Sequence, residues 1–351
     1  MTVKRTCLAV GAALCALHGT ARAQVPVSDK VVTVDAYPER RATFPGGVTG
    51  LPDLTYATIS GYRRLTLDLY VPSDSPAVRH PVVMYIHGGG WSGGSPRNAG
   101  AFENWPAVLA SIAARGYVVA SIEYRFSREA PFPAALHDTK NAIRWLRTNA
   151  AKYGVDTDRI LVWGSSAGGQ LAGLAATTCG VTELEPPVIA GRGERQGATP
   201  PAPPPSDCVQ AAVLWYAASD LEAAANPPPG SPDARGGAQR GGGGGPRDYL
   251  GCAPANCGGP AKAASVGTYV RASDPPILLI HGAADHTVPV VQSEKLYELL
   301  QAKGARSELL VFPGIDHSFI GKTPEATRDA SRKALERTIA FIDATIGSNS
   351  R

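Results

Sequence analysis

The sequence predicts a layered α/β fold, in which helices cover both faces of a mostly parallel β-sheet. Apolar runs of strand length alternate along the chain with segments of helical periodicity. With 351 residues, of which 44% are hydrophobic, the chain is long enough to bury a sizeable core. Strands that are buried on both faces are uninterrupted apolar runs, because neither face meets water. Such runs lie at 82–86, 117–122, 160–163, 211–216 and 277–280.

The other elements follow from local pattern. Leu65–Val71 alternates apolar and polar residues, which is typical of a strand with one buried face. A last strand is expected at 308–312, before a final helix that begins at Pro324 with Thr323 as its N-cap. Helices are expected where apolar residues recur at helical spacing. These positions are Leu136, Ile143, Leu146 and Ala150 in one helix and Leu335, Ile339, Ile342 and Ile346 in the last.

The N-terminal segment has the pattern of an export signal. Lys4 and Arg5 precede an apolar run at 7–17 that is too short to span a bilayer, and Ala-Arg-Ala at 21–23 is a cleavage site of the A-x-A type. We therefore expect a signal peptide at 1–23 and export to the periplasm or the medium. No later run is long enough to span a bilayer, so no membrane span is expected after the signal is removed.

Glycine and proline define the domain boundaries. They are frequent at 24–53, where we expect an extended lead-in, and 54–346 is expected to be one domain. Between Val181 and Pro260 they occupy 28 of 80 positions. Such a composition does not bury enough apolar surface to fold alone. We therefore expect loop insertions at about 181–208 and 225–262.

Four cysteines remain after the signal, namely Cys179, Cys208, Cys252 and Cys257. An even number in an oxidising compartment predicts two disulfides, for which three pairings exist. We expect Cys179–Cys208 and Cys252–Cys257, since nearest-neighbour bonds would constrain a segment that has little core of its own. A zinc site is less favoured, because the single C-x4-C motif lacks a second close pair.

The charge balance excludes two classes of partner. Removing Lys4, Arg5 and Arg22 with the signal leaves 31 basic and 30 acidic residues, a net charge of about +1. A nearly neutral chain has no basic surface for nucleic acid or anionic lipid. No nucleic-acid partner is therefore expected.

A candidate nucleophile lies between a strand and a helix. Gly-Ser-Ser-Ala-Gly at 164–168 fits G-x-S-x-G, directly after the strand at 160–163. A sharp strand-to-helix turn needs small residues on both sides, and it presents the central hydroxyl at a helix N-terminus, where negative charge is favoured. The motif alone is equally compatible with an ordinary glycine turn. We interpret Ser166 as the nucleophile.

A glycine-rich loop decides between these two interpretations. His-Gly-Gly-Gly-Trp at 87–91 follows the strand at 82–86, as the oxyanion-binding loop of lipases and esterases does. Glycines allow successive N–H groups to point at one developing negative charge without a Cβ in the way. We assign the N–H groups of Gly89, Gly90 and Ala167 as the donors. A phosphate-binding loop is less favoured, because the lysine and the G-x-G-x-x-G spacing are missing.

A serine hydroxyl needs a base, which is itself oriented by an acid. Among the seven histidines, His317 lies in a loop between the strand at 308–312 and the last helix. Asp285 follows the strand at 277–280, which completes the chain order Ser…Asp…His. Asp316 is a rival acid, but side chains adjacent in sequence rarely face each other with hydrogen-bond geometry.

These motifs resemble those of exported bacterial α/β-hydrolases of the hormone-sensitive-lipase-like esterase kind, and more closely those of bifunctional acetylxylan and feruloyl esterases. The resemblance covers roughly 54–346 through HGGGW at 87–91, GSSAGG at 164–169 and GAADHTVP at 282–289. It implies an α/β-hydrolase fold and a serine carboxylesterase that works through an acyl-enzyme and requires no metal or cofactor. Ser165 stands where many hormone-sensitive-lipase-like enzymes have Asp, and the insertions fit no family pattern.

The expected substrates are short-chain or aryl esters of acetyl or feruloyl type, either small molecules or attached to a polymer. Trp91, Trp215 and His286 are candidate substrate-binding residues, although a tryptophan is equally a core aromatic. The insertions are expected near the mouth of the active site, where they would govern access.

Two alternatives remain open. An amidase, formamidase or peptidase can use the same fold and triad, although export argues against a formamidase and the lack of a recognisable propeller domain against a prolyl-oligopeptidase-like peptidase. A catalytically inactive binding protein of the same fold is an alternative of another class. Such proteins typically lose a triad residue, and all three are present here.

Overall fold

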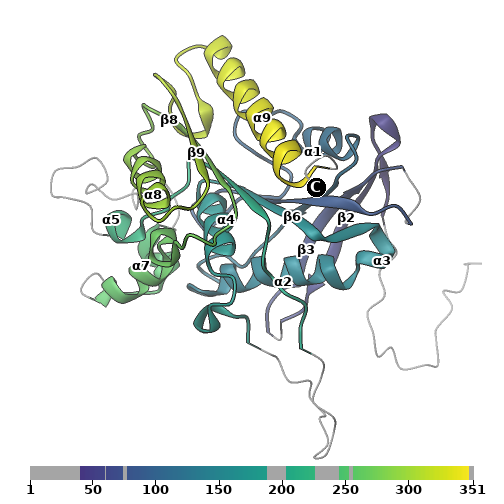
Figure 1. Cartoon of the computed structure of the whole chain (residues 1–351), viewed down its shortest axis with the longest axis horizontal. Coiled ribbons are helices and arrows are strands. Elements are labelled where there is room, and N and C mark those ends of the chain that lie inside the picture. The colour runs from purple at the N-terminus through teal and green to yellow at the C-terminus, as the bar shows by residue number, and fades with distance from the viewer. Residues whose placement is uncertain are drawn as a thin grey trace, which may run out of the picture. The chain divides into compact units, whose positions relative to one another are not determined.

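The computed structural model describes residues 40–59, 61–73, 77–187, 203–225, 245–252 and 256–347. Figure 1 shows these residues as a β-sheet with helices on both faces. The expected signal peptide at 1–23 and most of the lead-in lie outside the described residues. Within those residues, no helix has the length and the apolar character that crossing a membrane requires.

Within the described ranges, nine strands form one sheet in the order β1-β2-β3-β5-β4-β6-β7-β8-β9. The pairs from β1 to β5 are antiparallel and those from β5 to β9 are parallel, which confirms the predicted mostly parallel sheet. The strands are β1 (Ala42–Thr43), β2 (Thr49–Ala57), β3 (Leu65–Val71), β4 (His80–Ile86), β5 (Val118–Ile122), β6 (Val155–Ser165), β7 (Ala211–Trp215), β8 (Ile277–Gly282) and β9 (Ser307–Phe312).

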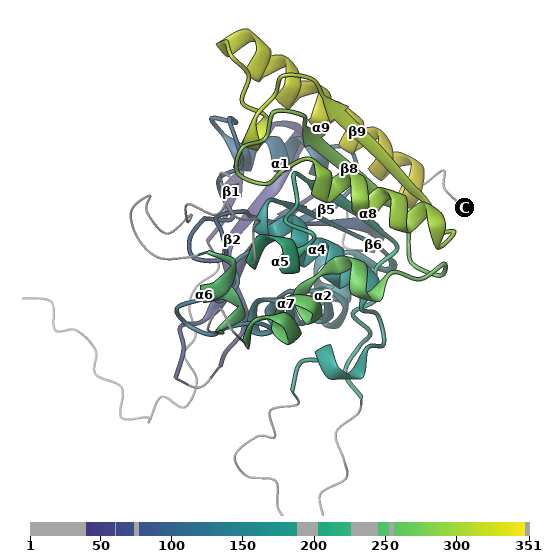
Figure 2. The same cartoon turned by 90° about the vertical axis from the view of Figure 1, so that its left-hand side faces the viewer.

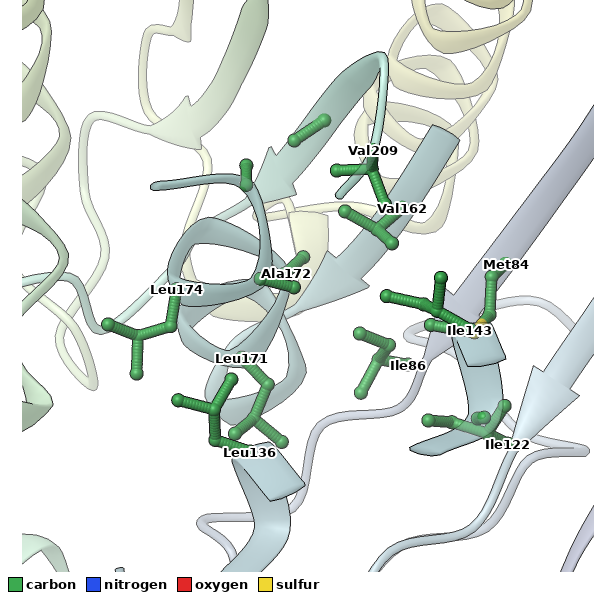
Figure 3. Packing of buried hydrophobic residues seen from close by; sticks show 14 of the residues in the cluster. Met84, Ile86, Ile122, Leu136, Ile143, Val162, Leu171, Ala172, Leu174 and Val209 are labelled. Atoms are coloured by element: carbon green, nitrogen blue, oxygen red, sulfur yellow. The ribbon is translucent and has the colours of Figure 1, made fainter. Parts of the chain in front are cut away.

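Strand β4 shows why the central strands are continuous apolar runs. Val82, Met84 and Ile86 pack into the core on one face of the sheet, and Val83 and Tyr85 into the core on the other. Because helices cover both faces, neither set of side chains meets water. Figure 3 shows Met84 and Ile86 among apolar side chains of the helices on their face.

The helices divide between the two faces. α1 and α9 cover one face, whereas α2, α4 and α8 cover the other (Figure 1). The predicted N-cap is confirmed, since Thr323 Oγ1 accepts a hydrogen bond from Ala326 N at 3.2 Å. The longer helices are α1 (Trp105–Ala113), α2 (Ala134–Thr148), α4 (Ala167–Thr177), α8 (Val291–Ala302) and α9 (Pro324–Ile346). The shorter ones are α3 (Ala150–Tyr153), α5 (Leu221–Ala225), α6 (Pro246–Leu250), α7 (Gly258–Ala264), η1 (Pro45–Gly47), η2 (Thr182–Leu184), η6 (Val266–Tyr269) and η7 (His317–Phe319).

Two local expectations need correction. The boundary between lead-in and domain at 53/54 falls inside β2, because the backbone of 49–57 pairs with β3 and belongs to the sheet. Strand β3 was expected to expose one face, yet Asp68 in its middle is buried. Burial of this carboxylate is possible because Arg97 Nε donates to Asp68 Oδ2 at 2.7 Å and Arg97 Nη2 donates to Oδ1 at 2.9 Å.

The first insertion, at 181–208, starts at the edge of the sheet opposite the Ser166 turn. α4 begins at that turn and runs back to the amino ends of the parallel strands, where β7 also begins. Both described ends of the insertion are therefore at the amino edge, and residues 188–202 between them lie outside the described residues. Cys179 and Cys208 form the expected disulfide there.

Charged side chains hold the same insertion against α2. Lys140 is almost fully buried, and its Nζ donates to Glu185 Oε1 at 2.9 Å. Arg144 binds both Glu185 and the buried Asp207. The disulfide closes a loop with a sequence separation of 29, for which chain entropy predicts a stabilisation of about 3 to 4 kcal/mol. The two described ends of the insertion are thus fastened to each other and to α2.

The second insertion, at 225–262, follows the carboxyl end of β7 and contains structure that composition did not predict. Figure 2 shows α5, α6 and α7 together, and these helices contact one another. Tyr249 and Leu250 of α6 and Ala261 of α7 are buried in the core. The expected disulfide Cys252–Cys257 joins the end of α6 to the start of α7. Residues 226–244 and 253–255 of this insertion lie outside the described ranges.

Candidate active site

The backbone turns sharply at Ser166, between β6 and α4. Its φ of 54° and ψ of −119° lie outside the regions that residues with a side chain prefer. Glycine is required on both sides, because a Cβ at Gly164 would lie 2.0 Å from the Gly168 carbonyl oxygen, and a Cβ at Gly168 would lie 2.1 Å from that of Ile86. The G-x-S-x-G spacing therefore reflects backbone contact between β6, α4 and β4.

His317 contacts both the serine and the acid. It lies in η7 after β9, with its Nε2 at 3.1 Å from Ser166 Oγ and its Nδ1 at 2.7 Å from Asp285 Oδ2. An ionised carboxylate can only accept a hydrogen bond, so Nδ1 carries the hydrogen in this pair. Nε2 is then free to accept the hydroxyl hydrogen of Ser166. The three residues predicted from the sequence form one hydrogen-bonded chain.

Asp285 follows β8 and is held as a carboxylate. Its Oδ1 accepts from the N–H groups of Thr287 and Val288, each at 2.8 Å. Burial raises the pKa of Asp285, but hydrogen bonds from His281 and His317 outweigh it and leave the pKa well below its ordinary value. The acid of the chain is therefore ionised wherever the imidazole can act as a base.

The rival acid Asp316 has a different role. Its Oδ1 accepts from the backbone N–H of His317 at 2.6 Å and of His286 at 2.9 Å, and its Oδ2 faces His286 Nδ1 at 3.0 Å. Asp316 thus fixes the backbone of His317. None of these three hydrogen bonds involves the imidazole ring of His317. His286 is 77% exposed in its side chain and lies at the rim, paired with Asp316.

The glycine loop lies directly beside the nucleophile. A Cβ at Gly88 would be 3.2 Å from Ser166 Cβ, and Gly89 and Gly90 have φ values of +123° and +59°. Gly89 and Gly90 line one pocket with Ser166. Among the residues that the structure describes, no acceptor binds the N–H groups of Gly89, Gly90 or Ala167. These three predicted donors are thus available to a ligand.

The start of the glycine loop is fixed by a buried imidazole. His87 Nδ1 donates to the Gly88 carbonyl at 2.7 Å, and its ring stacks on Tyr124 at 4.5 Å. Burial lowers the pKa of His87 to about 4, so the ring is neutral near neutral pH. A Cβ at Gly94 would lie 2.3 Å from this ring, which explains a further glycine in the loop. The loop conformation is therefore set by packing before any substrate binds.

The pocket beside Ser166 has a volume of about 400 Å³. The loop after β4 supplies one wall, through Ser95, Asn98 and Gly100, and Tyr216, Thr287 and Ser318 contribute from the strand ends. Tyr216 was not among the predicted site residues. It immediately follows β7, and its position at the carboxyl end of a parallel strand is the signal that would have found it.

The ring of Tyr216 contacts His317, the candidate base, and the phenol of Tyr216 stays neutral. Its ring meets the ring of His317 edge-on, with centroids 4.7 Å apart. Burial raises the pKa of Tyr216 to about 12, against a smaller opposite effect of hydrogen bonds with Ser318 and Ser165. The phenol can therefore donate a hydrogen bond at ordinary pH.

Two predicted substrate-binding residues are core residues instead. Trp91 is 3% exposed, stacks on Tyr249 and donates through Nε1 to Gln170 Oε1 at 3.0 Å. Trp215 is 1% exposed, and its Nε1 donates to Thr338 Oγ1 of α9 at 2.9 Å. Both indoles are buried with their N–H groups already bonded, so the expectation that they contact substrate is wrong.

Within the described residues, no group of three or more His, Cys, Asp or Glu side chains is arranged to hold a metal ion. The cysteines that a zinc site would have needed are joined in the two disulfides. The arrangement offers a serine hydroxyl hydrogen-bonded to an imidazole, and free N–H donors around one pocket. This combination fits nucleophilic attack on a carbonyl carbon.

Comparisons with known proteins agree with this geometry. The sequence profile of the BD-FAE family matches residues 67–300, and that of the prolyl oligopeptidase family matches 259–349. Esterase LipC of Mycobacterium tuberculosis is 33% identical over 255 residues, which are 72% of this chain and 56% of that protein. Carboxylesterase NlhH of the same organism is 40% identical over 121 residues, 33% of this chain and 35% of that one. The chain thus spans about a third to a half of the length of these relatives.

Solved structures extend the likeness to the fold. Thermogutta terrifontis esterase 2, phosphorylated by paraoxon, is 28% identical with a TM-score of 0.63, over 86% of this chain and 94% of that one. A truncated form of a carbohydrate esterase from gut microbiota is 26% identical with a TM-score of 0.60, over 82% and 96%. The family match covers more than half of the chain, so this protein belongs to the BD-FAE family and has the α/β-hydrolase fold.

Proposed function

We propose that this protein is a serine carboxylic ester hydrolase that works through an acyl-enzyme. The observation that carries the proposal is the hydrogen-bonded chain from Ser166 Oγ through His317 to Asp285, which ends beside the free N–H groups of the glycine loop. The names of the relatives support it, since those reported above are esterases or carboxylesterases.

The mechanism follows from the hydrogen positions. Ser166 Oγ attacks the ester carbonyl carbon while His317 Nε2 takes its proton, and the ionised Asp285 stabilises the imidazolium that forms. The imidazolium then gives the proton to the departing alcohol, which leaves an acyl group on Ser166. Water enters, loses a proton to His317 and attacks the acyl carbon, and return of the proton to Ser166 releases the acid.

The negative charge of each tetrahedral intermediate falls on the former carbonyl oxygen. The N–H groups of Gly89, Gly90 and Ala167 are the donors that we assign to it. One such donor lowers the barrier by about 3 kcal/mol, because it is oriented before the charge develops. The packing of His87 under this loop supports that preorganisation.

The pocket favours short acyl groups and polar alcohols. Its wall contains Ser95, Asn98, Thr287 and Ser318, whose hydroxyl and amide groups can form hydrogen bonds with a polar alcohol. Tyr216 narrows one side, since a Cβ at Gly100 would lie 3.6 Å from its hydroxyl. We infer acetyl-type or aryl esters, free or attached to a polymer. The likeness to a carbohydrate esterase supports this class.

Amide cleavage is the second candidate, and one observation favours it. The prolyl oligopeptidase profile matches the segment that contains both Asp285 and His317. The triad chemistry is common to both reactions, and the two differ in the leaving group that must be protonated. An inactive binding protein is the least favoured alternative, because the triad residues are not only present but in contact.

We further propose that the protein is exported to the periplasm or the medium. The signal pattern at 1–23 and the two disulfides support the proposal, since disulfides persist in oxidising compartments. The intact mass of protein recovered outside the cytoplasm should correspond to a chain that begins at Gln24 with two disulfides. A mature protein that retains residues 1–23, or carries four free thiols, would contradict export by this route.

Ser166→Ala should reduce hydrolysis of p-nitrophenyl acetate to near the uncatalysed rate, because no other group can form the acyl-enzyme. Removal of the nucleophile from a serine hydrolase costs about 10⁶-fold in kcat. Ser111→Ala, at a serine on α1 that bonds only the local Val108 carbonyl, is the matched control and should behave as wild type. Substantial turnover by Ser166→Ala, or labelling of this variant by a fluorophosphonate, would overturn the assignment of Ser166 as the nucleophile.

Gly89→Ala should lower kcat by about 10² to 10³-fold, the cost of one misplaced oxyanion donor. Its Cβ would lie 2.2 Å from the Gly93 carbonyl oxygen at a φ of +123°, so the backbone must shift. Gly93→Ala in the same loop is the control, since a Cβ there has nothing within 4 Å. If the two variants lose the same activity at equal folded content, the loop backbone does not serve the reaction in this way.

A panel of p-nitrophenyl esters should show kcat/KM highest for acetate and falling through butyrate to octanoate. Methyl ferulate and acetylated xylan test the aryl and the polymer-attached classes, and p-nitroacetanilide tests the amide of the same acyl group. We expect the ester to be cleaved faster than the anilide. Faster cleavage of the anilide would indicate an amidase. A kcat/KM that is highest for octanoate would contradict the proposed preference for short acyl groups.

Tyr216→Ala tests whether the Tyr216 ring limits the length of the acyl chain that the pocket accepts. Removing the ring opens the wall toward Gly100, so the octanoate-to-acetate ratio of kcat/KM should rise by about tenfold. Tyr216→Phe keeps the ring and removes only the hydroxyl, so this ratio should rise less than in Tyr216→Ala. An unchanged ratio in Tyr216→Ala would show that the ring does not limit the substrate.

A further inference from the structure

A second histidine lies behind the triad, outside the pocket. His281 is in β8, near its carboxyl end, and its side chain is fully buried. From the sequence it is only the end of an apolar strand. It stands four residues before Asp285, and its Nε2 and the Nδ1 of His317 both approach Oδ2 of that carboxylate. The chemistry of the proposed reaction does not use it directly.

Both ring nitrogens of His281 have defined partners. Nε2 lies 2.9 Å from the Val288 carbonyl oxygen and 3.2 Å from Asp285 Oδ2, and Nδ1 lies 2.7 Å from Ser293 Oγ. A carbonyl and an ionised carboxylate can only accept. Nε2 must therefore carry a hydrogen whether the ring is neutral or charged. The serine hydroxyl can either donate or accept, so it satisfies Nδ1 in both states.

This hydrogen fixes the turn that carries Asp285. Oδ1 is occupied by the N–H groups of Thr287 and Val288, and Oδ2 receives Nδ1–H of His317. The Nε2 hydrogen of His281 is donated to the Val288 carbonyl at 2.9 Å, and Nε2 itself lies 3.2 Å from Asp285 Oδ2. The Val288 residue is bound twice, by its N–H to Asp285 and by its carbonyl to His281. The ring thus ties the carboxylate to the turn that carries it and limits rotation of the carboxylate plane.

We propose that His281 is a positioning residue for the esterase reaction, which holds the turn at 285–288 through the bond from Nε2–H to the Val288 carbonyl, and thereby fixes the Asp285 carboxylate and orients His317. The proposal rests on the proposed function, since it acts through the triad. It extends the chain of polar contacts to Ser293, His281, Asp285, His317 and Ser166. Ser293 lies in α8, so the triad is anchored to that helix as well as to the sheet.

Two consequences follow if the hydrogen bond from His281 is lost. The carboxylate can turn away from His317, so the imidazole is less often aligned with Ser166 and kcat falls. The charge on Oδ2 is also less dispersed, which stabilises the imidazolium form of His317. Because the reaction needs the neutral imidazole, the acid limb of the pH profile moves to higher pH. Asp285 and His317 are the titratable groups that face this side of the ring; His286 and Asp316 pair with each other.

The decisive comparison is His281→Asn against His281→Gln. The asparagine amide reaches the position of Nδ1 and can still bond Ser293, but it is too short to reach the Val288 carbonyl. The glutamine amide reaches the position of Nε2 and can restore the donor to the Val288 carbonyl, next to Asp285. Both variants are polar and similar in volume, so packing changes are matched. Ser293→Ala removes the partner of Nδ1 but keeps Nε2–H in place, so it should lose less activity than His281→Asn.

For p-nitrophenyl acetate we expect His281→Asn to lower kcat by about 10 to 100-fold, less than the roughly 10⁴-fold cost of disabling a triad carboxylate. KM should change little, and the acid limb of kcat/KM should move up by at least half a pH unit. His281→Gln should recover most of both losses. A wild-type profile in His281→Asn, or equal losses in the two folded variants, would overturn the proposal.

A measurement on the unaltered protein covers the case in which His281→Asn does not fold. In ¹⁵N-edited spectra of the imidazole nitrogens, Nε2 of His281 should be protonated in the free protein and in its fluorophosphonate adduct. An unprotonated Nε2 would overturn the proposal. Failure of the esterase assignment is recognised separately, because Ser166→Ala would then retain activity in a chain whose His281 is intact.

Discussion

The sharp turn at Ser166 is the constraint on which the rest of the site depends. A backbone with φ of 54° and ψ of −119° costs of order 1–3 kcal/mol and persists only where its surroundings enforce it. Here β4 passes so close that Gly168 has no room for a side chain, and Trp215 of β7 accepts the N–H of Ser166. The position of the hydroxyl is therefore set by three strands of the sheet rather than by a loop.

The parallel sheet explains why residues distant in sequence meet at this hydroxyl. The glycine loop follows β4, the turn follows β6, Asp285 follows β8 and His317 follows β9, so all arrive at the carboxyl edge. The Asp285 carboxylate is hydrogen-bonded on both oxygens before any substrate is present, and His87 locks the start of the glycine loop. A site that needs little reorganisation during reaction is the most effective kind for electrostatic stabilisation.

The two Gly- and Pro-rich insertions differ because the sheet separates them. The described ends of the first are fastened at the amino edge by a disulfide and by the ion pairs of Lys140 and Arg144, away from the chemistry. The second leaves β7 at the carboxyl edge, and its helix α6 packs Tyr249 against Trp91 of the glycine loop. Gln170 of α4 accepts from Trp91 and donates to the Ala264 carbonyl, so this insertion is linked to the helix behind the nucleophile.

The sequence by itself determined the fold class and the three residues that form the hydrogen-bonded chain, because each of these has a local signature, whereas for the four cysteines it left three pairings open. Apolar runs reveal buried strands, and G-x-S-x-G and HGGGW record where backbone must approach backbone. Tertiary structure alone decided which aromatic residues are core, that Tyr216 lines the pocket, that the described ends of the first insertion lie at the amino edge, and that His281 binds the turn that carries Asp285. These properties depend on which edge and which face of the sheet a residue occupies. That position is set by how the strands are ordered, and strand order leaves no local mark in the sequence.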